Sequence, residues 1–255
     1  MTDSGTSPAD LAHADIGIVC ALPMELAPFF DRCERVRSYS GGEFSFRGGR
    51  YDGVRIAAVI CGMGFANARR ATQALVDAHT PAWILSAGFA GALRDGMKVG
   101  NIVMASSLAD THGNELSVEM NAPSDPSRGL YVGRIVTVDS MVRTVAEKRA
   151  LAARFDALAV DMESLAVAQV ARDTKTRFVA VRSISDDLSE DLPPEVLAVT
   201  GSTGTTRLGA ALTSIWKRPG SVKDMWRLRE AAQVASDQLA NFLDGVIRQL
   251  HAAHH

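Results

Sequence analysis

Two pairs of acidic residues flank one apolar unit of the chain. Asp161 and Glu163 precede this unit, and Asp186 and Asp187 follow it. A carboxyl group donates a proton when protonated, and takes up a proton or binds hydroxyl groups when ionised. The four acids therefore have the chemistry of a general acid–base site. For Asp161 and Asp187, a surface role in capping a helix or ending a strand explains the sequence at least as well.

The residues between the two pairs predict the elements that position them. Residues 164–172 have an apolar side and begin with Ser164, whose hydroxyl can cap a helix. Residues 178–184 predict a buried strand. Because alternate side chains of an extended segment point the same way, Asp161 and Glu163 are expected on one side. The later pair is expected at the carboxyl end of the strand, where open α/β sheets place their ligands.

At these residues the sequence resembles the purine nucleoside phosphorylase and nucleosidase superfamily. Its nucleosidase branch has a Val-Glu-Met-Glu segment that leads into a helix, then a strand ending Arg-Ala-Ile-Ser-Asp. The matching segments here are Val160-Asp161-Met162-Glu163 and Arg182-Ser183-Ile184-Ser185-Asp186, at a spacing that also fits. The resemblance implies an α/β fold, a single domain with a mixed, twisted central β-sheet flanked by helices. It also implies chemistry at the N-glycosidic bond of a purine nucleoside.

A further carboxyl group follows the first predicted strand. Residues 16–21 form an apolar run typical of a central strand, and residues 24–33 predict a helix with Pro23 in its first turn. Taken alone, Glu25 would be a solvent-facing helix residue. The resemblance instead gives it the place of the glutamate that follows the first strand of the nucleosidases.

Glycines mark three further segments. Gly48-Gly49 is expected near the turn of a hairpin that extends to Ile60. Gly62 and Gly64, before a helix that extends to Asp77, give a weak dinucleotide-loop signal, because Asn67 replaces the third glycine; a tight strand-to-helix turn explains them equally well. Residues 83–87 predict a strand that opens onto a loop at 88–94.

That loop carries the second resemblance. Gly88-Phe89-Ala90-Gly91-Ala92-Leu93 matches the superfamily's Gly-x-Ala-Gly-x-Leu. Lys98-Val99-Gly100-Asn101-Ile102-Val103 follows, where the family has Lys-x-Gly-Asp-Ile-Val. Phe89 replaces a serine usual in methylthioadenosine nucleosidases. The segment at 137–142 matches one that holds the purine, with Met141 in place of the stacking phenylalanine. A thioether can cover an aromatic face, although packing is the commoner task of a methionine.

The resemblance implies a role for each polar residue. Glu25, ionised, takes a proton from the attacking water, and Arg182 holds Glu25 or that water. Asp186, kept protonated by burial or by Asp187, donates to N7 of the purine. Glu163 binds the ribose diol as an ionised acceptor and favours a cationic transition state. The other residues implied to bind substrate are Met63, Gly88, Phe89, Met141, Val142, Met162 and Ser185.

Other activities remain open at this point. Phosphorylases of this fold place an arginine after the first strand, whereas Glu25 would repel phosphate, so hydrolysis is preferred; Arg47 or Arg69 would still serve a phosphate. A nucleoside-binding protein without turnover and a dinucleotide-dependent oxidoreductase are the further alternatives. Methylthioadenosine and S-adenosylhomocysteine are the default substrates. The extended helical part at 188–250 resembles that of phosphorylase-like proteins of hopanoid synthesis. Together with Phe89 and Met141, this part leaves futalosine-like and adenosyl-lipid substrates open.

Composition limits the class of protein. The 255 residues are 47% hydrophobic and 22% charged, which predicts one globular domain at 16–250 after a flexible tail at 1–15. A net charge of −2 provides no basic surface for nucleic acid. Three cysteines without C-x-x-C spacing, and no signal peptide or membrane span, predict a cytoplasmic protein. The histidines lack ligand spacing, so neither a metal nor a cofactor is expected. By resemblance, the segment at 109–133 implies a homodimer or a higher homo-oligomer.

Overall fold

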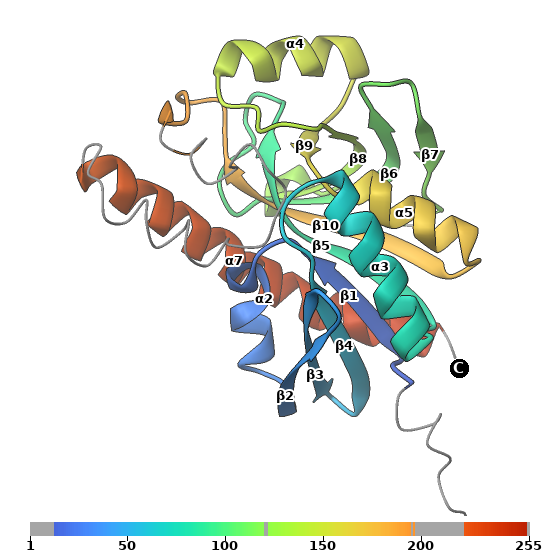
Figure 1. The fold of residues 1–255 in the computed structure, drawn as a ribbon. Helices are drawn as coiled ribbons and strands as arrows, with labels where there is room; N and C mark the ends of the chain where they lie inside the picture. Colours follow the sequence, from blue (N-terminus) through green and yellow to red (C-terminus); the bar gives the residue numbers. More distant parts are fainter. Residues whose placement is uncertain (1–12, 120–121, 195, 197–221, 254–255) are drawn as a thin grey trace, which may run out of the picture.

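The computed structural model describes residues 13–119, 122–194, 196 and 222–253. The strands are β1 (Ile16–Cys20), β2 (Glu34–Gly41), β3 (Phe44–Tyr51), β4 (Val54–Ile60), β5 (Trp83–Ala92), β6 (Ile102–Asp110), β7 (Glu115–Ser117), β8 (Leu130–Thr137), β9 (Ala159–Asp161) and β10 (Arg177–Asp186). The helices are α2 (Pro23–Phe30), α3 (Phe65–His79), α4 (Val145–Phe155), α5 (Ser164–Asp173), α7 (Val222–Ala252) and the short 3-10 helix η1 (Pro126–Arg128) (Figure 1).

The described strands form one mixed sheet that partly closes on itself. Its order is β10-β6-β8-β9-β5-β1-β4-β3-β2, with β7 beside β6 and an additional pairing of β10 with β5. Strands β4, β1, β5 and β10 are parallel, whereas β6 runs antiparallel to β10 and β9 runs antiparallel to β5. Because β5 pairs with both β10 and β9, five strands form a closed circuit. The expected single α/β domain with a mixed, helix-flanked sheet is confirmed.

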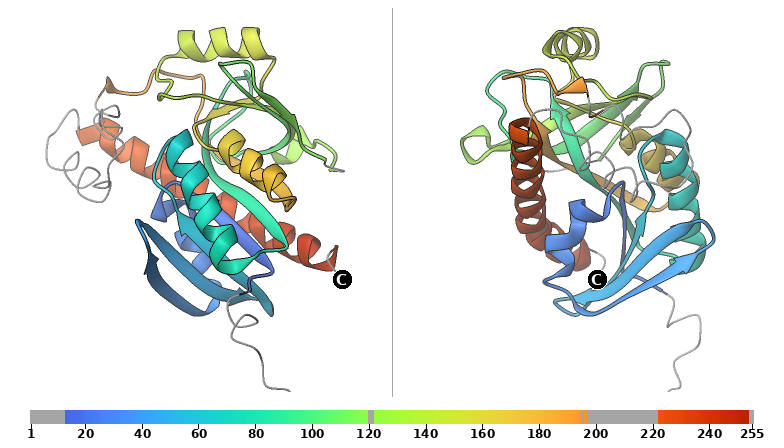
Figure 2. Two further views of the ribbon diagram at one scale, coloured as in Figure 1. Left: turned by 45° about the vertical axis from the view of Figure 1, so that its right-hand side comes forward. Right: turned by 60° about the vertical axis from the view of Figure 1, so that its left-hand side comes forward.

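Helices cover both faces of the sheet. Helices α2 and α7 lie on one face, and α3 and α5 lie on the other (Figure 2). The side chains of β1 alternate accordingly, since Ile16 and Ile18 enter the α2–α7 core whereas Val19 enters the α3 core. Gly17 faces α3 too closely for a side chain, because a Cβ atom there would lie 2.9 Å from Leu75.

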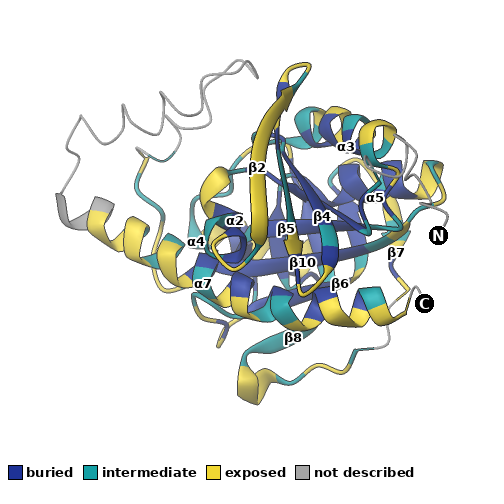
Figure 3. Cartoon of the chain, turned by 90° about the horizontal axis from the view of Figure 1, so that it is seen from below, coloured by how far each residue is buried: buried dark blue, intermediate teal, exposed yellow. Residues whose placement is uncertain are grey.

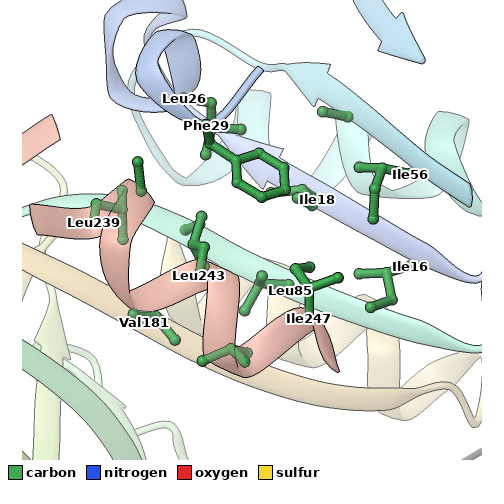
Figure 4. Close-up of a cluster of buried hydrophobic side chains, with 14 of the residues drawn as sticks. Ile16, Ile18, Leu26, Phe29, Ile56, Leu85, Val181, Leu239, Leu243 and Ile247 are labelled. Atoms are coloured by element: carbon green, nitrogen blue, oxygen red, sulfur yellow. The ribbon is translucent and has the colours of Figure 1, made fainter. Parts of the chain in front are cut away.

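The long helix α7 fixes the position of α2. Leu239, Leu243 and Ile247 are fully buried among side chains of α2, β1 and β5 (Figure 4). The hydroxyl of Ser236 donates to the backbone oxygen of Met24 at 2.9 Å. The outer side of α7 and the edge strand β2 are exposed (Figure 3). In the extended helical part expected at 188–250, the structure describes α7 as a helix. Residues 195 and 197–221 of that part, and residues 1–12 of the expected tail, lie outside the described residues.

Two turns differ from the sequence prediction. Gly48 and Gly49 lie inside β3, and the β3–β4 turn is formed by Asp52 and Gly53, with φ of 52° and 84°. Positive φ at both central residues is the geometry that Asp-Gly favours in two-residue hairpin turns. The expected glycine loop after Ala87 is also wrong, because β5 continues to Ala92.

The ends of two helices differ as well. Helix α2 stops at Phe30 and not at Cys33. The N-cap of α5 is Glu163, so that the predicted cap, Ser164, is the first helical residue. Its hydroxyl is buried without a hydrogen-bond partner.

Candidate active site

Glu25 is held at the end of β1 by two backbone amides. Leu22 N donates to Oε2 at 2.8 Å, and Phe89 N, on β5, donates to Oε1 at 2.9 Å. Pro23 begins α2 at a position where no amide hydrogen is needed. The side chain is buried, and burial raises the pKa of Glu25 although the Leu22 and Phe89 amides oppose the rise. A higher pKa makes a carboxylate a stronger base near neutral pH.

Arg182 lies beside Glu25, on β10. Its Nε donates to Asp161 Oδ2 at 2.7 Å and its Nη2 donates to Ser86 Oγ at 2.9 Å. A Cβ atom on Gly88 would lie 2.7 Å from Glu25 Oε1 and 2.8 Å from Arg182 Nη1, so glycine is required for these groups to share the space. Burial opposes the charge of Arg182, but Asp161 foremost, and then Glu163 and Glu25, hold its pKa above the ordinary value.

Asp161 is buried in this network and not on the surface. Besides binding Arg182, it accepts hydrogen bonds from Thr137 Oγ1 at 2.7 Å and from Ser164 N at 3.0 Å. The Thr137 hydroxyl oxygen in turn accepts from Leu165 N at 3.1 Å. Asp161 therefore serves the first turn of α5 and fixes the guanidinium at the same time.

Glu163 is the N-cap of α5 and faces the turn before α3. Gly64 N donates to its Oε1 at 2.6 Å, and Met162 N approaches Oε2 at 3.3 Å. Gly64 has a φ of 99°, which glycine adopts without strain. Burial, followed by the charge of Asp161, raises the pKa of Glu163 to about 8. This rise favours the protonated form of Glu163 near neutral pH, whereas the role that the resemblance implies needs the ionised form.

The turn that contains Gly62 and Gly64 binds a side chain of the protein itself. Its amide at Gly64 is directed at Glu163, where a dinucleotide loop would direct its amides at a pyrophosphate. This geometry disfavours the oxidoreductase alternative.

Asp186 belongs to a second group, at the carboxyl end of β10. Its Oδ1 accepts from Ser185 Oγ at 2.8 Å, and its Oδ2 lies 2.5 Å from the Nζ of Lys148. The side chain of Asp187 turns to the backbone amide of Ser189 instead, at 2.9 Å. The expected carboxylate neighbour of Asp186 is therefore replaced by an ammonium group. Lys148 was not among the site residues predicted from the sequence.

The two groups lie along the same pair of strands. Gly88 packs against Glu25 and Arg182, and Gly91, three residues further along β5, packs against Asp186 at 2.9 Å from a Cβ position. Three residues of extended chain span roughly 10 Å. The expected base on α2 and the expected acid on β10 thus face positions of β5 that are three residues apart.

The remaining predicted residues are placed by their sequence neighbours and by the core clusters against which they pack. Met63 and Met162 immediately precede Gly64 and Glu163. Met162 and Val142 pack against the buried cluster that contains Leu93 and Val136. Met141 is half-buried in the segment between β8 and α4, and its position over a purine ring remains a prediction.

Neither a metal cluster nor a membrane span is found in the part of the chain that the structure describes. No three or more His, Cys, Asp or Glu residues there are grouped as metal ligands. None of the helices searched there combines the length and apolar character that crossing a membrane requires.

Replacing Gly88 with alanine tests the packing of the charged pair. We expect Gly88→Ala to lower turnover by at least ~100-fold, because the new methyl group displaces Glu25 and Arg182 by a distance that positioning for catalysis does not tolerate. Gly245→Ala, in open space on α7, is the matched control and should leave turnover unchanged. Equal turnover by the two variants would contradict the assignment. Circular dichroism confirms that both are folded.

The raised pKa of Glu163 predicts how stability depends on pH. An unfolded glutamate loses its proton near pH 4.5, whereas folded Glu163 keeps it to about pH 8. The folded state therefore binds more protons between these values, so the free energy of unfolding should fall as pH rises through this window, by up to ~1.4 kcal/mol per pH unit. Burial of Glu25 acts in the same direction.

Urea unfolding at pH 5, 6, 7 and 8 measures this slope. Glu163→Gln cannot titrate, and its slope should be visibly smaller than that of the wild type. The same slope in both proteins would show that Glu163 is already ionised in the folded state.

Comparisons with known proteins agree with the fold. Residues 15–129 and 124–215 match the family model of the Phosphorylase superfamily. The 5'-methylthioadenosine/S-adenosylhomocysteine nucleosidase of Maridesulfovibrio salexigens is 28% identical over 201 residues, which cover 69% of this chain and 87% of that protein. The nucleosidase of the same name from Bacillus subtilis is 27% identical over 197 residues, covering 67% and 85%.

Solved structures show the same architecture. A Helicobacter pylori 5'-methylthioadenosine/S-adenosylhomocysteine nucleosidase superposes with a TM-score of 0.68 at 18% identity, covering 92% of this chain and 97% of that one. The futalosine hydrolase of Helicobacter pylori superposes with a TM-score of 0.64 at 18% identity, covering 92% and 99%. At these identities the likeness is one of fold. Since the family model covers most of its length, the chain belongs to the phosphorylase superfamily.

Proposed function

We propose that this protein hydrolyses the N-glycosidic bond of an adenine nucleoside, such as methylthioadenosine or S-adenosylhomocysteine, and releases the free base. The observation that carries the proposal is the buried carboxyl group of Glu25 at the end of β1, fixed by the amides of Leu22 and Phe89. A carboxylate at this position can take a proton from water, whereas it repels phosphate. The names of the relatives support the same activity.

The proposed mechanism divides the reaction among four side chains. Departure of the base leaves an oxocarbenium-like sugar, which water attacks as Glu25 takes up its proton. Asp186 delivers a proton to the leaving base at N7. Glu163 binds the sugar diol, and in its ionised form it stabilises the positive charge that develops on the sugar. Arg182 keeps Glu25 in place from the other side of Gly88.

The proposal specifies the class of substrate, an adenine nucleoside, and not one particular nucleoside. Phe89 contributes its backbone amide to Glu25, so the side chain at this position is free to differ from the serine of the nucleosidases. Phe89 stands where that branch has a serine, and Met141 stands where it has a phenylalanine. A futalosine-like nucleoside is the second candidate substrate, because a futalosine hydrolase shares this fold.

We further propose the setting in which the enzyme acts. The domain spans residues 16–250 with an extended helical part from 188, and the protein is a cytoplasmic homodimer that takes part in methionine salvage. Cys20, Cys33 and Cys61 are free thiols in the structure, which is compatible with a reducing compartment.

Product analysis tests the proposal. The protein is incubated with methylthioadenosine or S-adenosylhomocysteine, each with and without phosphate. We expect free adenine and a free pentose at rates independent of phosphate. Adenine released only with phosphate, beside a pentose 1-phosphate, would make the protein a phosphorylase. No adenine in any sample, with a nucleoside bound, would support a binding protein.

Substitution of Glu25 completes that experiment. Glu25→Gln keeps the shape of the side chain but removes the base, so kcat should fall by ~10²- to 10⁴-fold while nucleoside binding is retained. Glu43→Gln, an exposed residue paired with Arg70, is the control and should be as active as the wild type.

A further inference from the structure

Helix α4 buries one charged side chain. Within α4 the buried residues are Lys148 and Ala152, one turn apart, while the neighbours Glu147 and Arg149 are exposed. The side chain of Lys148 has no exposed surface. Removing an ammonium group from water is costly unless it is paired and hydrogen-bonded, so the inward direction of Lys148 requires partners.

Those partners lie at the end of β10. The Nζ of Lys148 is 2.5 Å from Asp186 Oδ2, and it donates to the backbone oxygen of Asp187 at 2.8 Å. The beginning of α4 is tied to the segment that follows β10, because Val145 N donates to Asp191 Oδ1 at 2.8 Å. Lys148 therefore joins the helix to the strand end that carries the proposed acid.

This pairing bears on how Asp186 obtains its proton. Two donors contact its carboxyl group, the Ser185 hydroxyl at Oδ1 and the Lys148 ammonium at Oδ2. The ammonium is the stronger acid of the two. A carboxylate paired with an ammonium can act as an acid when the proton moves along that contact.

We propose that Lys148 is a positioning residue for leaving-group protonation, and that it acts through Asp186. Lys148 holds Oδ2 of Asp186, so that Oδ1 is directed to the base when the Ser185 hydroxyl no longer binds it. Lys148 also supplies the proton that Asp186 transfers to the base. This inference rests on the proposed function.

The proton balance closes over one turnover. The bond between the anomeric carbon and the purine nitrogen breaks, and its electron pair leaves with the base. The base gains a proton at N7 from Asp186, which receives one from the Lys148 ammonium. Water forms the new bond to the anomeric carbon, keeps one proton as the hydroxyl and gives the other to Glu25. After product release, Glu25 returns its proton to solvent and Lys148 takes one up.

Leaving-group dependence tests the proposal. Lys148→Met is assayed with methylthioadenosine, or with the purine nucleoside that the wild type hydrolyses best, and with 4-nitrophenyl riboside, whose phenolate departs without protonation. We expect kcat for the purine nucleoside to fall by ~100-fold or more, with KM within about threefold, and kcat for the nitrophenyl riboside to change by less than about fivefold. Lys175→Met, which removes an exposed lysine, should match the wild type on both substrates.

An equal fall of kcat on the two substrates would mean that Lys148 has only a structural role, and would overturn the proposal. An unchanged kcat on both substrates would overturn it as well. Lys148→Gln, which keeps a hydrogen-bond donor but supplies no proton, serves in its place if the methionine variant does not fold, and the same difference between substrates is expected.

A double variant asks whether Lys148 works through Asp186. Once Asp186→Asn has removed the acid, adding Lys148→Met should slow the purine reaction no further. The double variant lacks both charges of the ion pair, so it leaves neither of them buried without its partner. A further loss of tenfold or more would contradict the proposal. If the proposed function itself is wrong, the wild-type protein releases no base, and this result is distinct from the outcomes above.

Discussion

The contact on which the site depends is the buried ion pair between Arg182 and Asp161. Arg182 is 2% exposed and Asp161 is 4% exposed, so neither charge is stabilised by water and each requires the other. The pair joins β10 to β9, and through Thr137 and Ser164 it also fixes β8 and the start of α5. Those elements set the position of Glu163, and Gly88 on β5 lets Arg182 approach Glu25. One guanidinium thus organises carboxyl groups that come from distant parts of the chain.

The arrangement has more negative than positive groups. Asp161 is matched by Arg182, and the pKa values of Glu25 and Glu163 are both raised, chiefly by burial. A proton on Glu163, whose pKa is raised to about 8, reduces the imbalance. A sugar that acquires positive charge as its base departs would reduce it as well, and would favour the ionised form of Glu163. Interactions that strengthen as charge develops are the ones that accelerate a reaction, because they stabilise the transition state more than the ground state.

The sequence predicted more of the carboxyl groups than of their partners. Glu25, Glu163, Asp186 and Arg182 were found because their spacing matches a family, and the main strands followed from apolar runs. Asp161 stayed undecided, since alternation along a strand does not distinguish a buried face from a surface. Lys148 was missed because it lies between Glu147 and Arg149 in a polar segment. Only the packing of α4 over the end of β10 turns it inward.

The positions of the glycines were also predicted only in part from the sequence. Gly88 and Gly91 were assigned to a loop because they match a loop motif of the superfamily. They lie in β5 because Glu25 on α2 and Arg182 and Asp186 on β10 need the space of a side chain. The Asp52–Gly53 turn, in contrast, was available from local sequence alone, and the adjacent Gly48-Gly49 was preferred wrongly.

Affinity for a charged sugar tests the central claim most directly. Two nucleoside analogues would be compared by calorimetry at neutral pH, one with a protonated nitrogen in the sugar ring and one a neutral ring of the same shape, with the same base. An excess of carboxyl groups around Arg182 predicts that the cation binds at least ~100-fold more tightly, about 2.7 kcal/mol, and that its binding releases protons. Equal affinities, or a preference for the neutral ring, would contradict the account.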